Sequence, residues 1–154
     1  MEQLNADPKF QAQRAERERV RLKRAAECAP EDEAIASEAR GLGLNVTSVW
    51  DFVNNDGREY LGHYFSGPYE AAYPLLIKHL AIEHDPRIRE GVIRALTVKD
   101  GGPPVAEALL REFEREKEPG LRWVLANALR TALSTSQRRR RPEIQRAYKS
   151  GGKE

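Results

Sequence analysis

Apolar residues recur at helical spacing in the second half of the chain. In "DPRIREGVIRAL", residues 85–96, the side chains of Ile88, Val92 and Leu96 stand four positions apart and so share one face of an α-helix. The segment opens with Asp-Pro, and an acidic N-cap followed by proline at the first helical position is a favourable helix start. The pattern therefore predicts a helix whose apolar stripe packs against a neighbouring helix.

The arrangement occurs twice, because a shift of 33 residues aligns this segment and the one before it with the next two segments. The predicted helical hairpins cover residues 69–98 and 103–133. One helix cannot bury its apolar stripe alone, whereas stacked hairpins bury it between them, so the repeat predicts an all-α fold. The aligned positions are Leu76 with Leu109, Ile77 with Leu110, Leu80 with Phe113, Asp85 with Glu118, Ile88 with Leu121, Arg89 with Arg122, and Ala95-Leu96 with Ala128-Leu129.

These two segments resemble the HEAT-repeat (armadillo-like) family, in particular its small bacterial members. The second helix of a HEAT repeat typically reads Asp-x-x-Val-Arg-x-x-Ala-x-x-Ala-Leu, and residues 85–96 and 118–129 follow this pattern. They depart from it at Val92 and Leu125, where alanine is usual. The resemblance covers residues 69–134 and implies a short right-handed stack of HEAT-like hairpins, whose second helices form a curved binding surface.

The rest of the chain divides around this repeat. We expect residues 1–29 to form a charged helix that ends before Pro30, because the residue before a proline is disfavoured in the α conformation. Residues 30–137 would form the HEAT-like domain, with residues 31–54 as a shortened helical unit at its start. Residues 138–154 are predicted to be a basic, poorly ordered tail.

The net charge of +2 hides an uneven distribution. Residues 1–28 carry +2, residues 29–137 carry −5 and residues 138–154 carry +5, and basic ends of this kind attract phosphates or acidic surfaces. Cys28 is the single cysteine, so an internal disulfide is excluded. The charged start lacks the apolar stretch of a signal peptide, and no apolar run is long enough to span a bilayer. A reducing cytoplasm is the expected location.

The candidate catalytic residues do not form a recognisable constellation. The three histidines are His63, His79 and His84, and the five-residue spacing of the last two would splay them across a helix. The chain has no nucleophile-elbow motif, no glycine-rich phosphate loop and no paired cysteines. We therefore expect no enzyme, no cofactor and no metal site, and structural or solvated roles for the histidines.

Protein binding is the favoured function class, through positions on the second helices that lie off the apolar stripe. Trp123 stands where the first repeat has Glu90, and an exposed tryptophan beside Arg and Asn is typical of interface hot spots. The alternative is that residues 142–149 fold back and cover Trp123. The candidate protein-binding residues on the second helices are Glu90, Arg94, Trp123, Asn127 and Arg130.

Aromatic residues around position 60 form a second candidate surface. Four of the five tyrosines lie between residues 60 and 73, and Trp50 precedes them. They either roof the open end of the helical core or form a recognition loop, with Trp50 and Tyr64 as further protein-binding candidates. The four tyrosines are Tyr60, Tyr64, Tyr69 and Tyr73.

The sequence thus predicts a non-enzymatic protein-interaction module or adaptor. The alternative is a nucleic-acid-associated protein that uses the basic tail and the N-terminal helix, with weak, sequence-independent and salt-sensitive binding to phosphates. The acidic charge of residues 29–137 argues against it. Its candidate residues are Arg138, Arg139, Arg140 and Arg141.

Overall fold

The computed structural model describes residues 7–56, 59 and 62–152 of the chain. Over these residues the fold is all-α: helices are joined by turns and loops, and no β-strand is present. The chain divides at Pro30 into two compact units, residues 1–30 and residues 31–154. The hairpins and every candidate site discussed below belong to the second unit.

Helix α2 runs from Pro8 to Gly41 and contains Pro30 in its interior. The prediction that a helix ends before Pro30 is therefore wrong. A proline inside a helix removes one backbone hydrogen bond and costs about 3 kcal/mol, which the strong helix formers on both sides offset here. Its C-terminal part also buries Ile35, Ala36 and Ala39 in the core of the second unit.

Within residues 8–30 the helix carries mainly exposed side chains. Two ion pairs join residues one turn apart, Arg19 with Glu16 at 2.7 Å and Arg21 with Glu18 at 2.5 Å. Exposed pairs of this kind contribute little to stability, so the helix of this unit depends mainly on the intrinsic propensity of its alanines, arginines and glutamates.

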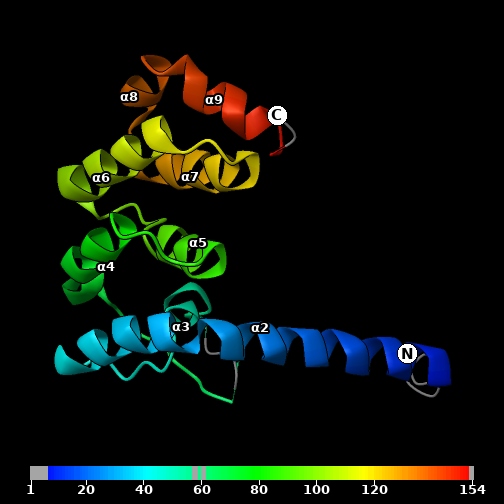
Figure 1. The fold of residues 1–154 in the computed structure, drawn as a ribbon. Helices are drawn as coiled ribbons and strands as arrows, with labels where there is room; N and C mark the ends of the chain where they lie inside the picture. Colours follow the sequence, from blue (N-terminus) through cyan, green and yellow to red (C-terminus); the bar gives the residue numbers. More distant parts are fainter. Residues whose placement is uncertain (1–6, 57–58, 60–61, 153–154) are drawn as a thin grey trace. The chain divides into compact units, whose positions relative to one another are not determined.

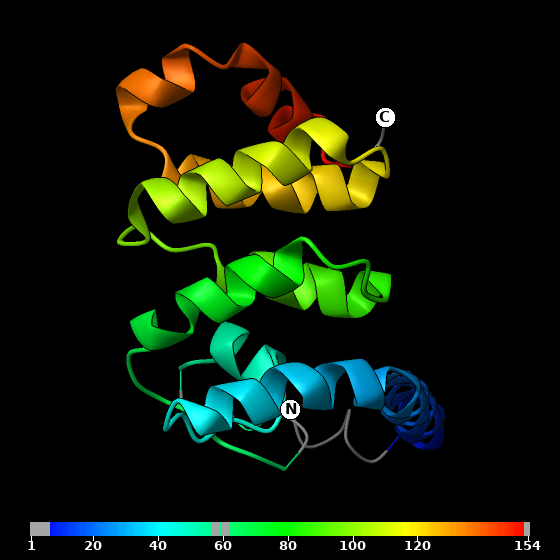
Figure 2. The same cartoon turned by 60° about the vertical axis from the view of Figure 1, so that its left-hand side comes forward.

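The second unit contains two helical hairpins of the predicted kind. Each first helix contacts its own second helix, and the hairpins stack so that α4 packs on α6 and α5 packs on α7 (Figures 1 and 2). The short helix α3 packs on α5. The elements are α3 (Trp50–Val53), the 3₁₀ turn η1 (Glu70–Ala72), α4 (Tyr73–Leu80), α5 (Pro86–Ala95), α6 (Gly102–Arg115) and α7 (Pro119–Ala132).

The two hairpins begin their second helices with the same capping contact. The carboxylate of Asp85 accepts a hydrogen bond from the backbone N–H of Arg87 at 2.9 Å. Glu118, 33 residues later, accepts from the N–H groups of Gly120 at 2.9 Å and Leu121 at 2.6 Å. Each acidic side chain satisfies backbone donors that have no partner within the helix, which confirms the helix starts expected from the Asp-Pro and Glu-Pro pairs.

The arginine that follows each cap repeats as well. Arg89 donates through Nη1 to the carbonyl oxygen of Leu80 at 2.9 Å, and Arg122 donates through Nη1 to that of Phe113 at 2.7 Å. Leu80 and Phe113 lie at the ends of α4 and α6, where backbone carbonyls lack helical partners. In each hairpin this arginine therefore ties the second helix to the end of the first.

The core of the second unit lies between these helices. The apolar stripe predicted for the second helices is buried in both hairpins, so the assignment of their inner faces is confirmed. Gly91 allows α3 to approach α5 closely, because a Cβ atom at this position would lie only 2.8 Å from Cγ1 of Val49. The buried stripe residues are Ile88, Val92, Ala95 and Leu96 on α5 and Leu121, Leu125, Ala128 and Leu129 on α7.

The C-terminal segment folds into helices α8 (Thr135–Arg139) and α9 (Pro142–Lys149), and α9 packs on α7. The prediction of a poorly ordered tail from residue 138 is therefore wrong for residues 138–152. A capping box between Ser134 and Gln137 starts α8, and α9 buries Ile144 and Ala147. Helices this short are stable only through such packing, so the amphipathic spacing of α9 outweighs the arginine run beside it.

Among the described helices, none combines the length and the apolar character needed to cross a membrane.

Candidate interaction surface

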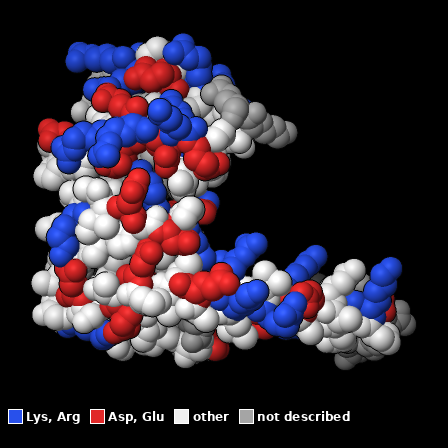
Figure 3. Space-filling view, in the orientation of Figure 1, with Lys and Arg blue, Asp and Glu red and all other residues white. Residues whose placement is uncertain are grey.

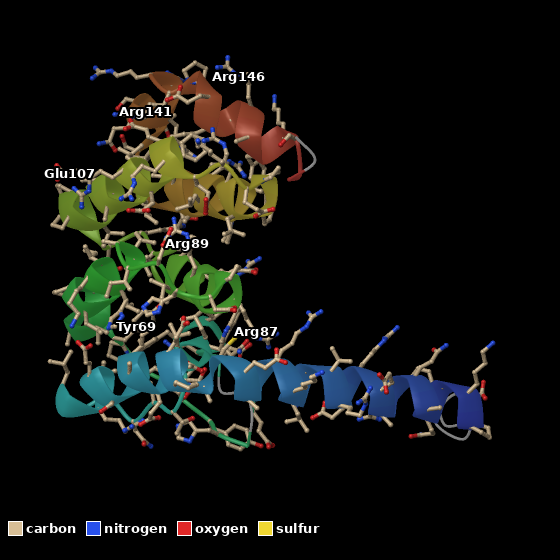
Figure 4. The ribbon with its side chains drawn as sticks, in the orientation of Figure 1. Tyr69, Arg87, Arg89, Glu107, Arg141 and Arg146 are labelled. Carbon is tan, nitrogen blue, oxygen red and sulfur yellow. The ribbon has the colours of Figure 1, made fainter. Side chains whose placement is uncertain are left out.

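The side of the second unit formed by α3, α5 and α7 is the second-helix face. On the α3–α5 part of this face, the guanidinium of Arg87 lies 5.9 Å from the ring centroid of Trp50, within the range of a cation–π contact (Figure 4). Glu90, one turn further along α5, forms an ion pair at 2.9 Å with Arg94 in the turn after it. An aromatic ring and charges of both signs are thus held together by two helices.

These α5 side chains are accessible to a partner. The side chains of Glu90 and Arg94 retain 35% and 33% of their exposure, and their ion pair joins neighbours on the same helix. Ile93, the neighbour of Arg94, is fully buried. The open surface on α5 is therefore the strip that contains Arg87, Glu90 and Arg94.

The α7 part of the face is covered. The indole N–H of Trp123 donates to the backbone carbonyl oxygen of Tyr148 at 3.1 Å, and the two rings stack with centroids 5.8 Å apart. The guanidinium carbon of Arg130 lies 3.8 Å from the centroid of the Tyr148 ring. Helix α9 thus covers Trp123, as the alternative from the sequence proposed, and leaves both Trp123 and Asn127 half-buried.

The aromatic segment before η1 is divided between core and surface. Phe65 and Tyr69 pack on Phe52 with ring centroids 5.7 and 4.8 Å away, and Tyr69 donates its hydroxyl to the carbonyl of Ala95 at 3.0 Å. Tyr64 is 58% exposed and donates to Glu59. The segment therefore roofs the core around Phe52, with Tyr64 outside it; Tyr60 lies outside the described residues.

Partial burial affects the ionisation of two half-buried tyrosines, Tyr69 and Tyr73. Desolvation, with the negative charges of Asp100 and Glu70 as smaller causes, raises the pKa of Tyr69 to about 12. Tyr73 donates its hydroxyl to Asp100 at 2.8 Å, and burial together with this contact raises its pKa as well. Both side chains therefore remain neutral hydrogen-bond donors at physiological pH, which suits a structural role.

Basic side chains gather on the outer surface of α8 and α9 (Figure 3). Arg138 is used internally, because its Nη1 donates to the carbonyl oxygen of Arg130. Arg139, Arg140 and Arg146 are exposed, and Figure 4 shows Arg146 pointing away from α7. Arg140 and Arg141 also line a shallow groove with Leu110, Leu133, Gln137 and Glu143. The arginine run thus belongs to an ordered helical surface.

Sequence reasoning missed a chain of hydrogen-bonded side chains that joins α2, α4 and the loop before α5. Nδ1 of His79 lies 2.9 Å from Nε2 of His84, although their spacing had suggested that they splay apart. Helix α4 ends at Leu80, so His84 lies in the following loop, which turns it back towards His79. Glu31 and Glu38, two helical turns apart on α2, contact the outer nitrogens of the two rings. Glu31 and Glu38 share one face of α2, and this spacing is the feature of the sequence that could have indicated the contact.

An acidic cluster surrounds the arginine of the first repeat. Arg89 pairs with Glu112 at 3.0 Å and with Glu116 at 3.1 Å, both on α6, so it joins the two hairpins. Glu112 is only 7% exposed; Arg89 is its closer counter-charge, and Arg115, whose side chain is largely exposed, lies 3.4 Å from its other carboxylate oxygen. No group of three or more His, Cys, Asp or Glu side chains within the described part of the chain could hold a metal ion.

Comparisons with protein-family models, curated proteins and solved structures yielded no match to this chain.

Proposed function

We propose that residues 31–154 form a non-enzymatic protein-interaction module, built as a short right-handed stack of HEAT-like hairpins behind a charged N-terminal helix. A protein partner binds the α3–α5 part of the second-helix face, around Trp50, Arg87, Glu90 and Arg94. The single free cysteine is consistent with a small bacterial adaptor in a reducing cytoplasm.

The observation that carries this proposal is the contrast within the face. Both hairpins bury the same inner positions, yet α9 covers Trp123 on the outer side of α7, whereas Glu90 and Arg94 on α5 pair with each other and retain 35% and 33% of their side-chain exposure. Tryptophan and arginine are the residues that most often dominate binding energy at protein interfaces. Trp50 and Arg87 supply this pair on a rigid helical support, which limits the entropy lost on binding.

The proposal is tested by site-specific crosslinking in cells that express the full chain. A photoreactive amino acid at position 94 reports on the α5 strip, and the same residue at position 107 is the matched control. Glu107 is exposed on α6, on the side of the first helices (Figure 4). We expect one defined protein adduct from position 94 and none from position 107. Equal adducts from both positions, or none from position 94, would contradict the proposal.

A second candidate function is binding of nucleic acid by α8 and α9. The observation that favours it is the ordered basic surface, since none of Arg139, Arg140, Arg141 and Arg146 forms an ion pair with a carboxylate among the residues placed by the structure. Backbone phosphates are the natural counter-charges of such a surface, and their binding weakens steeply with salt.

Gel shifts with duplex and single-stranded DNA and RNA at two salt concentrations test this candidate. Replacing those four arginines by glutamine should abolish a low-salt shift. The matched control replaces Arg14, Arg17, Lys23 and Arg24 of α2 by glutamine, which removes the same charge from residues 8–30. No shift of the unaltered chain at low salt would exclude this function, and loss of the shift only in the control would assign it to α2.

A further inference from the structure

Four side chains form an unbroken chain of contacts across the second unit. Oε1 of Glu38 lies 2.9 Å from Nε2 of His79, and Nδ1 of His79 lies 2.9 Å from Nε2 of His84. Nδ1 of His84 in turn lies 3.1 Å from Oε2 of Glu31. His79 is 5% exposed and the side chain of His84 is 8% exposed, so water has little access to these contacts. Every nitrogen of both rings therefore has a protein partner.

The hydrogen bonds between these four side chains favour one ionisation state of the histidine pair. Each of the three contacts is favourable when one proton lies between its two heavy atoms, and an ionised carboxylate can only accept. Two neutral imidazoles carry two protons; if both donate to the carboxylates, two lone pairs face each other at 2.9 Å. Two imidazolium ions carry four protons, so two N–H groups collide there. Three ring protons satisfy all three contacts, and this number corresponds to one neutral imidazole and one imidazolium ion.

We propose that His79 and His84 form a buried binding site for one proton, shared between the two imidazoles, which fastens α2 to α4 and to the loop before α5. Glu31 extends the attachment, because its Oε2 also accepts from the backbone N–H of Asp85 at 2.7 Å. Asp85 is the N-cap of α5, so the proton site is connected to the start of the helix that carries Arg87, Glu90 and Arg94. The inference is independent of the proposed partner.

The surrounding charges agree with a single bound proton. Burial, as the largest cause, lowers the pKa of His79 against the opposing contact with Glu38, which disfavours a second positive charge. Lys78 also donates to Glu38 and, with His79, lowers the pKa of that carboxyl. On its other side, His84 lines an open cleft of about 450 Å³, through which a proton can exchange with solvent. The charged groups that line this cleft with His84 are Glu83, Asp85, Arg89, Glu112, Arg115 and Glu116.

The proposal predicts a maximum in stability near the ordinary pKa of histidine. In the unfolded chain two free imidazoles have pKa values of about 6.5, so at about that pH the two rings together carry on average one proton more than two neutral imidazoles do. Below this pH the unfolded chain binds more protons than the folded pair, so stability falls as the pH falls. This is the direction that the lowered pKa of His79 requires. Above it the folded pair keeps its proton while the unfolded chain releases protons, so stability falls as the pH rises.

Urea denaturation of the full chain between about pH 5 and pH 9 measures this dependence. The matched variant is His84→Asn, because the asparagine side-chain nitrogen can replace Nδ1 and donate to Glu31 but cannot reach His79. We expect the folding equilibrium constant of the wild type to decline on both sides of the maximum, by at most about tenfold per pH unit for one proton. In His84→Asn the alkaline decline should disappear.

Nuclear magnetic resonance of the ¹⁵N-labelled wild type tests the site without a variant. A scalar coupling across the hydrogen bond between Nδ1 of His79 and Nε2 of His84, with one shared proton near pH 6.5, supports the proposal. Two uncoupled neutral imidazoles at that pH overturn it. An alkaline decline that persists unchanged in His84→Asn overturns it as well. If the variant does not fold, the coupling measurement decides alone.

Discussion

Helices α5 and α7 come from the same sequence pattern but present different outer surfaces. Their inner positions are buried alike, and both begin with an acidic cap and an arginine that binds the end of the preceding helix. The outer positions diverge: Glu90 and Arg94 of α5 pair with each other at the surface, whereas Trp123 of α7 is stacked under Tyr148. The comparison separates the residues that make the hairpin from those that are available for other uses.

The covered α7 face shows how a short helix can bury the outer positions of a hairpin. Helix α9 packs on α7 with Ile144 and Ala147 buried. Arg146 and Lys149 of α9 are exposed on its other side. On this interpretation Trp123 is part of the attachment of α9, and the open surface lies on α5.

The largest expected effect tests the equivalence of the two cores. Leu96→Ala and Leu129→Ala should each lower the free energy of unfolding by about 2–5 kcal/mol, because each removes a fully buried side chain and leaves a cavity. Urea denaturation of the two variants at neutral pH measures both values. Wild-type stability in either variant would show that the repeat alignment misplaces that hairpin.

Periodicity predicted these hairpins because burial acts on every third or fourth residue of a helix. The boundaries expected at 85 and 118 agree with the caps at Asp85 and Glu118, where local chemistry specifies the helix start. At Pro30 the expected helix end is wrong, because the strong helix formers on both sides outweigh the non-helical preference of the residue before a proline. Proline thus indicated a helix start correctly at Pro86 and Pro119 and a helix end wrongly at Pro30.

The periodicity of apolar residues could not predict contacts between segments that are distant in the sequence. The histidine pair depends on α4 ending at Leu80, after which helical spacing no longer describes His84. The arginine run at residues 138–141 favoured a disordered tail, although Ile144, Ala147 and Tyr148 of the following helix α9 have amphipathic spacing. The sequence left two alternatives for Trp123, exposed or covered by residues 142–149, because it does not reveal which surface a short helix covers.

The second prediction concerns the repeated arginine, whose two copies have different partners. Arg89→Ala should cost about 3 kcal/mol, because it removes the closer counter-charge of the buried carboxylate of Glu112 and leaves only the longer contact with the exposed Arg115. Arg122→Ala should cost only about 1–2 kcal/mol, since Arg122 binds backbone carbonyls and the ring of Phe113. Chemical denaturation compares the two variants.

A third variant identifies the cause of the larger loss. Adding Glu112→Gln to Arg89→Ala should recover part of the stability, because the amide removes the unpaired negative charge. Equal losses in the two arginine variants, with no recovery in the double variant, would show that the ion pairs between α5 and α6 contribute no more than the shared hydrogen bond to a helix end.

The third prediction tests the cover on α7. Trp123→Ala should destabilise the protein by about 2 kcal/mol, less than a fully buried tryptophan, because its ring is half-buried and stacked on Tyr148. Tryptophan fluorescence in a Trp50→Phe background should be blue-shifted and poorly quenched by iodide. Freely quenched emission and unchanged stability would mean that α9 leaves the α7 face open in solution.

The smallest effect on stability is expected on α5, where it separates binding from folding. An exposed pair one turn apart contributes about 0.3–0.5 kcal/mol, so Glu90→Ala and Arg94→Ala should melt almost as the wild type does. Charge reversal by Arg94→Glu should nevertheless weaken a purified partner's binding at least about tenfold, because it places two carboxylates together beside Trp50 and Arg87.

Isothermal titration calorimetry with that partner, identified by crosslinking at position 94, gives the affinities. Glu107→Arg is the matched charge-reversal control on the first-helix side, and it should bind as the wild type does. Trp123→Ala should reduce the fraction of folded protein while leaving the affinity of the folded part unchanged. If Trp123→Ala abolished binding and Arg94→Glu had no effect, the working surface would be the junction of α7 and α9, and the open strip on α5 would be only a solvated helix face.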